Sequence, residues 1–296
     1  MTKIEIEING KMESFSMPSE WHELSFFQYS KIIEANEKFH TIEDIIMCIL
    51  YILLPKEFTY IIDLSKKELK KSVNDKCYYA GIIEDLVSLV YEFAASPKEM
   101  VNPNFDQLII KDKIKGNSIF YGPDKDFSHL RINEYGLVEN AIKSFVDSKD
   151  FDHLYQMVAI LYRPKITSAQ IEKLGDDYEG DPRAPYSDLD LQKRVKFFKS
   201  KLTKYEVLAI KDWYTVAHKL NFEEGYPFVF KKKKESFFDI DAPQNDYAVA
   251  GMVLEMAGAK WGLVHQVYKQ YCDNIFLDLN RINEKMEEEN LNRILQ

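Results

Sequence analysis

The chain has 296 residues, of which 46% are hydrophobic, with 18 Tyr and 19 Phe and a formal net charge of -9 at pH 7. This aromatic content excludes a largely disordered chain, and 11 Gly and 10 Pro are too few for an all-β fold with many tight turns. The negative charge argues against nucleic acid as the main partner, because phosphate binding needs a basic surface.

The cysteines and the apolar runs indicate the environment of the protein. Cys48, Cys77 and Cys272 are scattered and odd in number, which is typical of a reducing compartment. The longest apolar run, residues 45–54, is about half of what a bilayer span requires. Acidic residues stand where a signal peptide would have its apolar core. We therefore expect neither secretion nor membrane contact.

The first seventeen residues predict a β-hairpin. Ile4, Ile6 and Ile8 alternate with acidic residues, which is the period of a half-buried strand. Asn9–Gly10 is a favoured pair for a two-residue turn, and residues 12–17 form the expected returning strand.

Helices are expected to fill most of the remaining chain, because capping pairs precede several stretches of helical apolar spacing. Three of the expected helices begin at capping pairs: Ser25 with Gln28, Thr41 with Asp44 (helix 42–54), and Ser65 with Glu68. The other expected helices span 78–93, 133–146, 151–162, 187–198 and 203–220.

Three segments interrupt this helical pattern. Residues 107–121 predict a second hairpin around the loop Lys115–Gly116–Asn117. Residues 163–187 form a long polar connection, and a connection of this length is either mobile or functional. Residues 221–244 are irregular, with Gly225, Pro227 and Pro243.

The end of the chain predicts one long amphipathic helix with an exposed end. Its apolar positions recur in steps of three and four: Val264, Tyr268, Tyr271, Ile275, Leu279, Ile282 and Met286.

The predicted fold is therefore mainly α, a multi-helix globular protein with an N-terminal β-hairpin and a second small hairpin near the middle. We expect an N-terminal hairpin and helical region with the second hairpin at 1–125 and a C-terminal helical region at 126–296, although one domain is an alternative.

No motif for catalysis, metal or cofactor binding is visible. The six histidines never pair at metal-ligand spacing, no glycine loop suits a phosphate, and no nucleophile elbow occurs. The acidic loop at 176–181 lacks the ligand period of an EF-hand, so a solvated loop is the better interpretation. We expect a non-enzymatic protein without a cofactor.

Two surfaces are candidates for binding another protein. In the polar connection, proline pre-extends the backbone while Arg163, Arg183 and Tyr186 supply anchor side chains. The alternative is that this segment is an ordered loop packed across the helices. The second surface is the C-terminal helix, with the candidate contacts Tyr268, Tyr271, Ile275, Ile282 and Met286.

Residues 18–33 resemble the start of small tail-morphogenesis proteins of tailed bacteriophages. Those proteins begin with a short strand and a phrase of the form Pro-x-x-Trp-x-Glu-hydrophobic-Thr-x-x-Gln-hydrophobic, here with Ser25 in the Thr position. The matching residues are Trp21, Glu23, Leu24, Ser25, Gln28 and Tyr29. Residues 161–164, 181–186 and 261–290 are also similar, whereas the hairpin at 107–121 has no counterpart.

The resemblance implies a tail-assembly chaperone in the cytoplasm of the infected bacterial host cell. Its partner would be a long helical, tape-measure-like tail protein. The alternative is a structural component of the virion, such as a neck, ring or head–tail connector protein, that oligomerises with neighbouring subunits. A third hypothesis is an enzyme whose site combines the Asp176 loop with a distant histidine.

Overall fold

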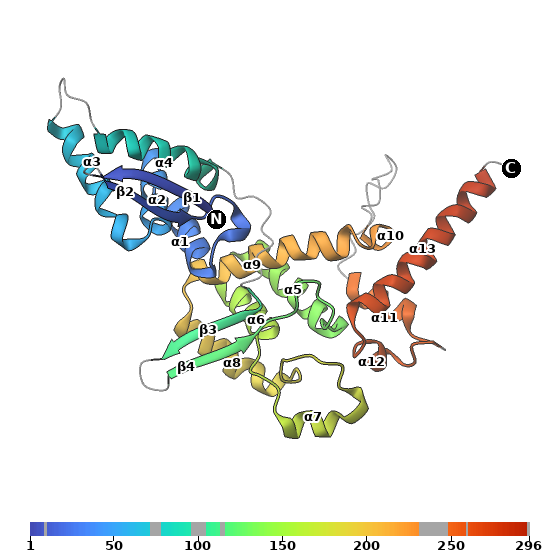
Figure 1. Ribbon diagram of the computed structural model, residues 1–296. Coiled ribbons are helices and arrows are strands. Elements are labelled where there is room, and N and C mark those ends of the chain that lie inside the picture. The colour runs from blue at the N-terminus through green and yellow to red at the C-terminus, as the bar shows by residue number, and fades with distance from the viewer. Residues whose placement is uncertain are drawn as a thin grey trace. The chain divides into compact units, whose positions relative to one another are not determined.

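The structure is a computed structural model that describes residues 1–8, 11–71, 78–95, 105–112, 116–230, 248–258 and 260–294. This part of the chain contains thirteen α-helices and two two-stranded antiparallel sheets (Figure 1). The predicted mainly α class with an N-terminal and a central hairpin is therefore confirmed. No helix among the described residues is long and apolar enough to cross a bilayer.

The contacts between residues divide the chain into two compact units. Unit 1 comprises residues 1–104 and 204–213, and unit 2 comprises 105–203 and 214–296. The division passes through helix α9, which spans Lys204–His218. The domain boundary near residue 125 stays a prediction.

Unit 1 consists of a hairpin and helices. Its elements are β1 (Thr2–Ile8), β2 (Lys11–Met17), the 3-10 turn η1 (Trp21–Glu23), α1 (Phe26–Lys38), α2 (Ile42–Leu53), the 3-10 turn η2 (Lys56–Phe58), α3 (Tyr60–Lys71), α4 (Tyr78–Ala95) and the first part of α9.

The N-terminal hairpin and the first helix follow the sequence prediction. β1 pairs antiparallel with β2 from Thr2 opposite Met17 onward, while the predicted turn at residues 9–10 lies outside the described residues. Ser25 caps α1, since its side chain accepts from the backbone N–H of Gln28 and the Gln28 side chain accepts from the backbone N–H of Ser25.

The core of unit 1 forms around the tryptophan of the segment 18–33. The Trp21 ring meets Tyr29 edge-on at 5.5 Å and Phe93 edge-on at 4.9 Å between ring centroids. All three side chains are less than 9% exposed. Such edge-to-face pairs stabilise a core beyond simple area burial.

Unit 2 contains the second hairpin and the remaining helices. Its elements are β3 (Gln107–Asp112), β4 (Gly116–Tyr121), α5 (Ile132–Ser148), α6 (Phe151–Leu161), α7 (Ser168–Leu174), the 3-10 turn η4 (Gly175–Asp177), α8 (Asp188–Lys201), the end of α9, the π-helix η5 (Lys219–Glu223), α10 (Pro227–Phe230), α11 (Ala248–Met256), α12 (Val264–Val267) and α13 (Cys272–Ile294).

Two boundaries differ from the prediction. Gly116 and Asn117, expected in the loop of the central hairpin, are paired within β4, opposite Asp112 and Lys111. The rest of that loop lies outside the described residues. In unit 1, Ser65 does not begin a helix: α3 starts at Tyr60, and Ser65 is buried in its middle.

The end of the chain is not the single helix that its apolar spacing predicts, because residues 268–271 separate α12 from α13. The backbone of this stretch bonds to the segment before α5. The N–H of Ile132 donates to the carbonyl of Gln270 (2.9 Å), and the N–H of Cys272 donates to that of Leu130 (2.8 Å). These long-range bonds take the place of helical ones.

The two expected irregular segments also contain helices. In the connection 163–187, Thr167 and Gln170 form a capping box that begins α7. Residues 219–230 form η5 and α10, whereas residues 231–244 lie outside the described part of the chain.

Candidate functional site

Unit 2 contains a cavity of about 640 Å³, which lies within the usual range for small-ligand sites. Four stretches line it: the start of α5, the residues after α6, the segment from α7 to Tyr186, and residues 266–271. Its lining includes four basic side chains (Arg131, Arg163, Arg183, Lys269) and three acidic ones (Glu134, Glu179, Asp181).

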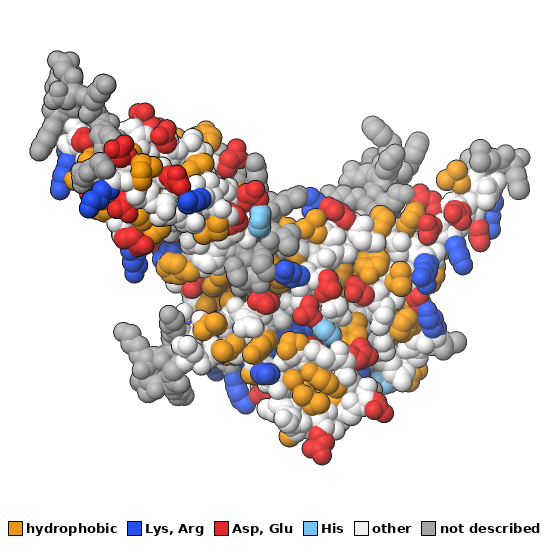
Figure 2. Space-filling view, in the orientation of Figure 1, with side chains coloured by type: hydrophobic (Ala, Val, Ile, Leu, Met, Phe, Trp, Pro, Cys, Tyr) orange, Lys and Arg blue, Asp and Glu red, His pale blue; other side chains and the backbone are white. Residues whose placement is uncertain are grey.

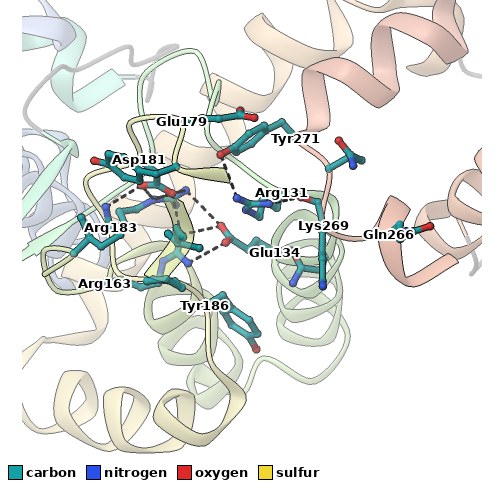
Figure 3. Close-up of a pocket in the computed structure, with 16 residues that line it drawn as sticks. Arg131, Glu134, Arg163, Glu179, Asp181, Arg183, Tyr186, Gln266, Lys269 and Tyr271 are labelled. Carbon is teal, nitrogen blue, oxygen red and sulfur yellow. Dashed lines mark hydrogen bonds and ion pairs between the residues drawn. The ribbon is translucent and has the colours of Figure 1, made fainter. Parts of the chain in front are cut away.

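A buried ion network forms one wall of this cavity (Figure 3). Nη1 of Arg163 lies 2.9 Å from Oε1 of Glu134, and Nη2 of Arg183 lies 3.5 Å from Oε2 of the same carboxylate. Asp181 accepts from the side-chain Nε and the backbone N–H of Arg183, both at 2.9 Å. Two arginines and two acids therefore neutralise one another inside the unit.

Chain geometry explains how these four residues meet. Glu134 lies in the first turn of α5, where the helix dipole favours an acid, and Arg163 follows the end of α6. Arg163 is also fixed by its backbone, which exchanges hydrogen bonds with Tyr121 at the end of β4. Arg183 is fixed by donating to the carbonyl of His129 at 2.8 Å.

Burial and neighbouring charges shift the pKa values of the network residues in opposite directions. Desolvation lowers the pKa of Arg163 to about 10, although Glu134 partly opposes this shift. For Arg183 burial also works to lower the pKa, but Glu134 and Asp181 overcome it and raise the pKa. Burial would raise the pKa of Asp181, yet Arg183 and then Arg163 hold it below its ordinary value. Arg163, Arg183 and Asp181 are therefore charged at neutral pH.

Two guanidinium groups that line the cavity differ in their hydrogen bonding. Among the residues that the structure describes, Nε of Arg163 has no hydrogen-bond partner, although its side chain is only 1% exposed. The guanidinium of Arg131 lies 4.7 Å from the centre of the Tyr271 ring, and its Nη2 donates to the Tyr271 hydroxyl at 3.2 Å. Arg131 also donates to the backbone carbonyl of Lys269. These contacts fix the orientation of the Arg131 guanidinium group.

A second surface in unit 2 is the far end of α13. Ile275, Leu279, Ile282 and Met286 follow one another in steps of four, three and four, so they lie on one face of the helix. Ile275 and Leu279 are 0% and 3% exposed, whereas Ile282 and Met286 are 47% and 56% exposed. The apolar face therefore continues beyond the part that the unit buries.

The eight side chains predicted to bind a partner lie in different environments. Three are buried: Arg163, Arg183 and Ile275. The three tyrosines, Tyr186, Tyr268 and Tyr271, are buried or half-buried. The last two, Ile282 and Met286, are exposed. The structure brings four of them together at the cavity: Arg163, Arg183, Tyr186 and Tyr271.

Burial corrects the picture of Arg163 and Arg183 as surface anchors, because their guanidinium groups are held by acids inside unit 2. The segment is an ordered loop packed across the helices, which is the alternative that the residue pattern left open. Asp181 is likewise no member of a solvated acidic loop, since it pairs with both arginines.

Nothing in the residue pattern indicated Glu134, Arg131 or Lys269 as site residues. Glu134 looks like an ordinary first-turn acid, and the other two look like exposed charges. The one overlooked signal is the Thr167–Gln170 capping box, which predicts α7 within the connection. In the described residues no group of three or more His, Cys, Asp or Glu side chains is arranged to hold a metal ion.

A third cluster surrounds the π-helix η5. The Tyr135 hydroxyl lies 3.1 Å from Nε2 of His218, whose Nδ1 is 3.3 Å from Glu223, and the Tyr214 hydroxyl donates to Glu139 at 2.9 Å. Burial raises the pKa of Glu139, and Glu223 adds to that rise. None of these five residues lines the cavity described above.

In comparisons with known proteins, no protein-family model, no curated protein and no solved structure matches the chain.

Proposed function

We propose that this protein is a non-enzymatic protein-binding factor of bacteriophage tail morphogenesis, a tail-assembly chaperone that holds a long, helical, tape-measure-like tail protein. The observation that carries the protein-binding part is the exposed continuation of the apolar face of α13 at Ile282 and Met286. The phage part rests on the resemblance of residues 18–33.

The packing of α13 explains where its free face begins. The side chain of Asn280 accepts from the backbone N–H of Phe228 in α10 at 2.8 Å, and Asn283 donates to the Phe228 carbonyl at 3.1 Å. These two bonds hold the first half of α13 to the unit. The apolar positions at and beyond this anchor are exposed to solvent: Ile282, Met286 and Leu291.

The chemistry of the exposed part suits an amphipathic helical partner. Ile282 and Met286 supply apolar contacts, and methionine adapts its shape to different partners. Charged side chains flank them, with Arg281 and Lys285 among acids at 284 and 288, and Figure 2 shows hydrophobic side chains between charged ones along α13. An amphipathic helix in a groove or against a helix face is recognised in this way.

The charge of the chain also suits this role. A holder of an aggregation-prone helix must itself stay soluble, and a net charge of -9 favours this. A tape-measure-like protein presents long apolar helical faces before the tail tube encloses them, so a chaperone with a complementary apolar helix would shield them.

The test uses the double variant Ile282→Ala with Met286→Ala. Alanine keeps the helix and removes only exposed apolar groups, so the variant is expected to melt as the wild type does. The matched control is Leu189→Ala, which removes an 86% exposed apolar side chain in α8. Each protein would be isolated from the cells that produce the phage, and its co-purifying protein identified by mass spectrometry.

We expect the wild type and the control to recover one long helical tail protein, the double variant to lose it, and finished particles to lack the chaperone. If all three proteins recover the same amount of the tail protein, the exposed face of α13 is not the binding surface. Stoichiometric presence in purified particles would replace the chaperone with a neck, ring or connector component.

A further inference from the structure

We propose that the cavity of unit 2 binds a carboxylate carried on a small apolar body, with Arg131 and Lys269 as the charged contacts. This site is separate from the exposed end of α13 and does not depend on the proposed tail-assembly role.

The charge balance of the cavity favours a single negative group. Four basic and three acidic side chains line it, which leaves one positive charge in excess. Glu134 and Asp181 are fully engaged by Arg163 and Arg183, so the excess resides with Arg131 and Lys269. A dianionic phosphate would exceed this positive charge beside three carboxylates, whereas one carboxylate matches it.

The donors are arranged for a planar oxyanion. The Arg131 guanidinium is held in place by the Tyr271 ring and by two hydrogen bonds, from Nη2 to the Tyr271 hydroxyl and from Nη1 to the Lys269 carbonyl. Because a guanidinium carries five N–H groups, others remain for a ligand. A planar fork of this kind binds a carboxylate through two parallel hydrogen bonds. No acid among the described residues forms an ion pair with the Lys269 ammonium, and its side chain is exposed at the cavity.

Nε of Arg163 is a buried donor without an acceptor among the described residues. A buried N–H without an acceptor costs free energy, on the order of 1–3 kcal/mol in proteins generally, so such groups are rare unless a ligand or water completes them. The Arg163 side chain lines the cavity, but its Nε has almost no exposed surface, so a ligand would reach this donor only after the side chain shifts. Figure 3 shows Arg131 and Glu134 from the start of α5 near Arg163, which follows α6.

The rest of the lining determines what the carboxylate is attached to. The wall supplied by residues 166–186 contains Ile166, Leu174, Pro185 and Tyr186, which favour an aliphatic or aromatic body. A free small acid and the C-terminal carboxylate of a peptide ending in an apolar residue share this chemistry.

The experiment measures binding by isothermal titration calorimetry and ligand-observed NMR on the full chain. The probes are 3-phenylpropionate, its neutral amide, the peptide acetyl-Ala-Ala-Phe with a free C-terminus, the same peptide amidated, and inorganic phosphate. We expect at least one free acid to bind and its amide to bind at least about tenfold more weakly. Tighter binding of the peptide acid would identify a chain terminus as the ligand, and tighter binding of phenylpropionate a small molecule.

Variants then assign the contacts. Arg131→Gln is expected to weaken binding of the acid about tenfold or more, and Lys269→Gln about threefold, since its ammonium is exposed. Lys196→Gln, an equal charge change on the exposed face of α8, is the control and should bind as the wild type does. Thermal melting checks each fold, and Lys269→Gln keeps the test valid if Arg131→Gln unfolds.

Four results would overturn the proposal. The first is the absence of binding by both free acids up to about 10 mM, a concentration roughly tenfold above a weak, millimolar dissociation constant. The others are equal binding of acids and amides, and binding of phosphate while both acids stay silent. Affinity for the acid that is unchanged in Lys269→Gln and in folded Arg131→Gln would also overturn it.

Discussion

The carboxylate of Glu134 lies 2.9 Å from the guanidinium of Arg163, and both side chains are only 1% exposed. An ion pair this deeply buried is costly to form, because both charges leave water, and it is more costly to break. Its second arginine, Arg183, shares the same carboxylate. The stability of unit 2 is therefore expected to depend on these few buried charges.

Replacing Glu134 by Gln is expected to destabilise the protein by about 3–5 kcal/mol, because it leaves two buried guanidinium groups without their shared anion. Urea unfolding followed by circular dichroism would measure the change. The control Glu172→Gln alters an exposed acid in α7 and should change the midpoint little. A Glu134→Gln protein as stable as the wild type would show that the network contributes nothing to folding.

Asp181 gives the stability of unit 2 a dependence on acid pH. Its folded-state pKa lies below the ordinary value of 3.8, so its contribution is complete above that value and is lost as the pH falls through the folded pKa. Asp181→Asn is therefore expected to be less stable than the wild type at pH 7 and at pH 5, with a smaller difference at pH 3. Urea midpoints at these three pH values test this. A difference that is constant with pH would mean that folding does not shift the pKa of Asp181.

The pH dependence of stability expected from Glu139 has the opposite sign to that expected from Asp181. Burial raises its folded-state pKa above 4.5, so ionisation disfavours folding, and stability is lost as the pH rises from the unfolded pKa through the folded pKa. Glu139→Gln keeps an acceptor for the Tyr214 hydroxyl and is expected to raise the melting temperature at pH 7 but not at pH 4. Differential scanning calorimetry at both pH values would show it. A lower melting temperature at pH 7 would contradict the prediction.

Ser25 is expected to contribute about 1 kcal/mol to unit 1, because its hydroxyl caps α1 and the loss of such a cap has this typical cost. Ser25→Ala should therefore lower the urea midpoint. Ser88→Ala, the same change on the exposed face of α4, should leave it unchanged or raise it slightly, since alanine favours a helix interior. The prediction fails if the two variants unfold at the same denaturant concentration.

Local signals in the residue order were enough to predict several elements. Alternating isoleucines predicted β1, and the capping pair at Ser25 and Gln28 marked the start of α1, because both signals act within a few residues. The apolar face of α13 likewise follows from spacing alone. These features depend on neighbouring residues, so a single sequence suffices to predict them.

Which charges are buried, and where the last helix begins, depends instead on the three-dimensional arrangement. Arg163 and Arg183 look like surface residues in the sequence, but Glu134, far from either along the chain, draws both into the interior. The break before α13 likewise depends on backbone bonds between residues 130–133 and 268–272. Long-range pairing of this kind has no periodic pattern, because its free energy depends on groups that only the fold brings together.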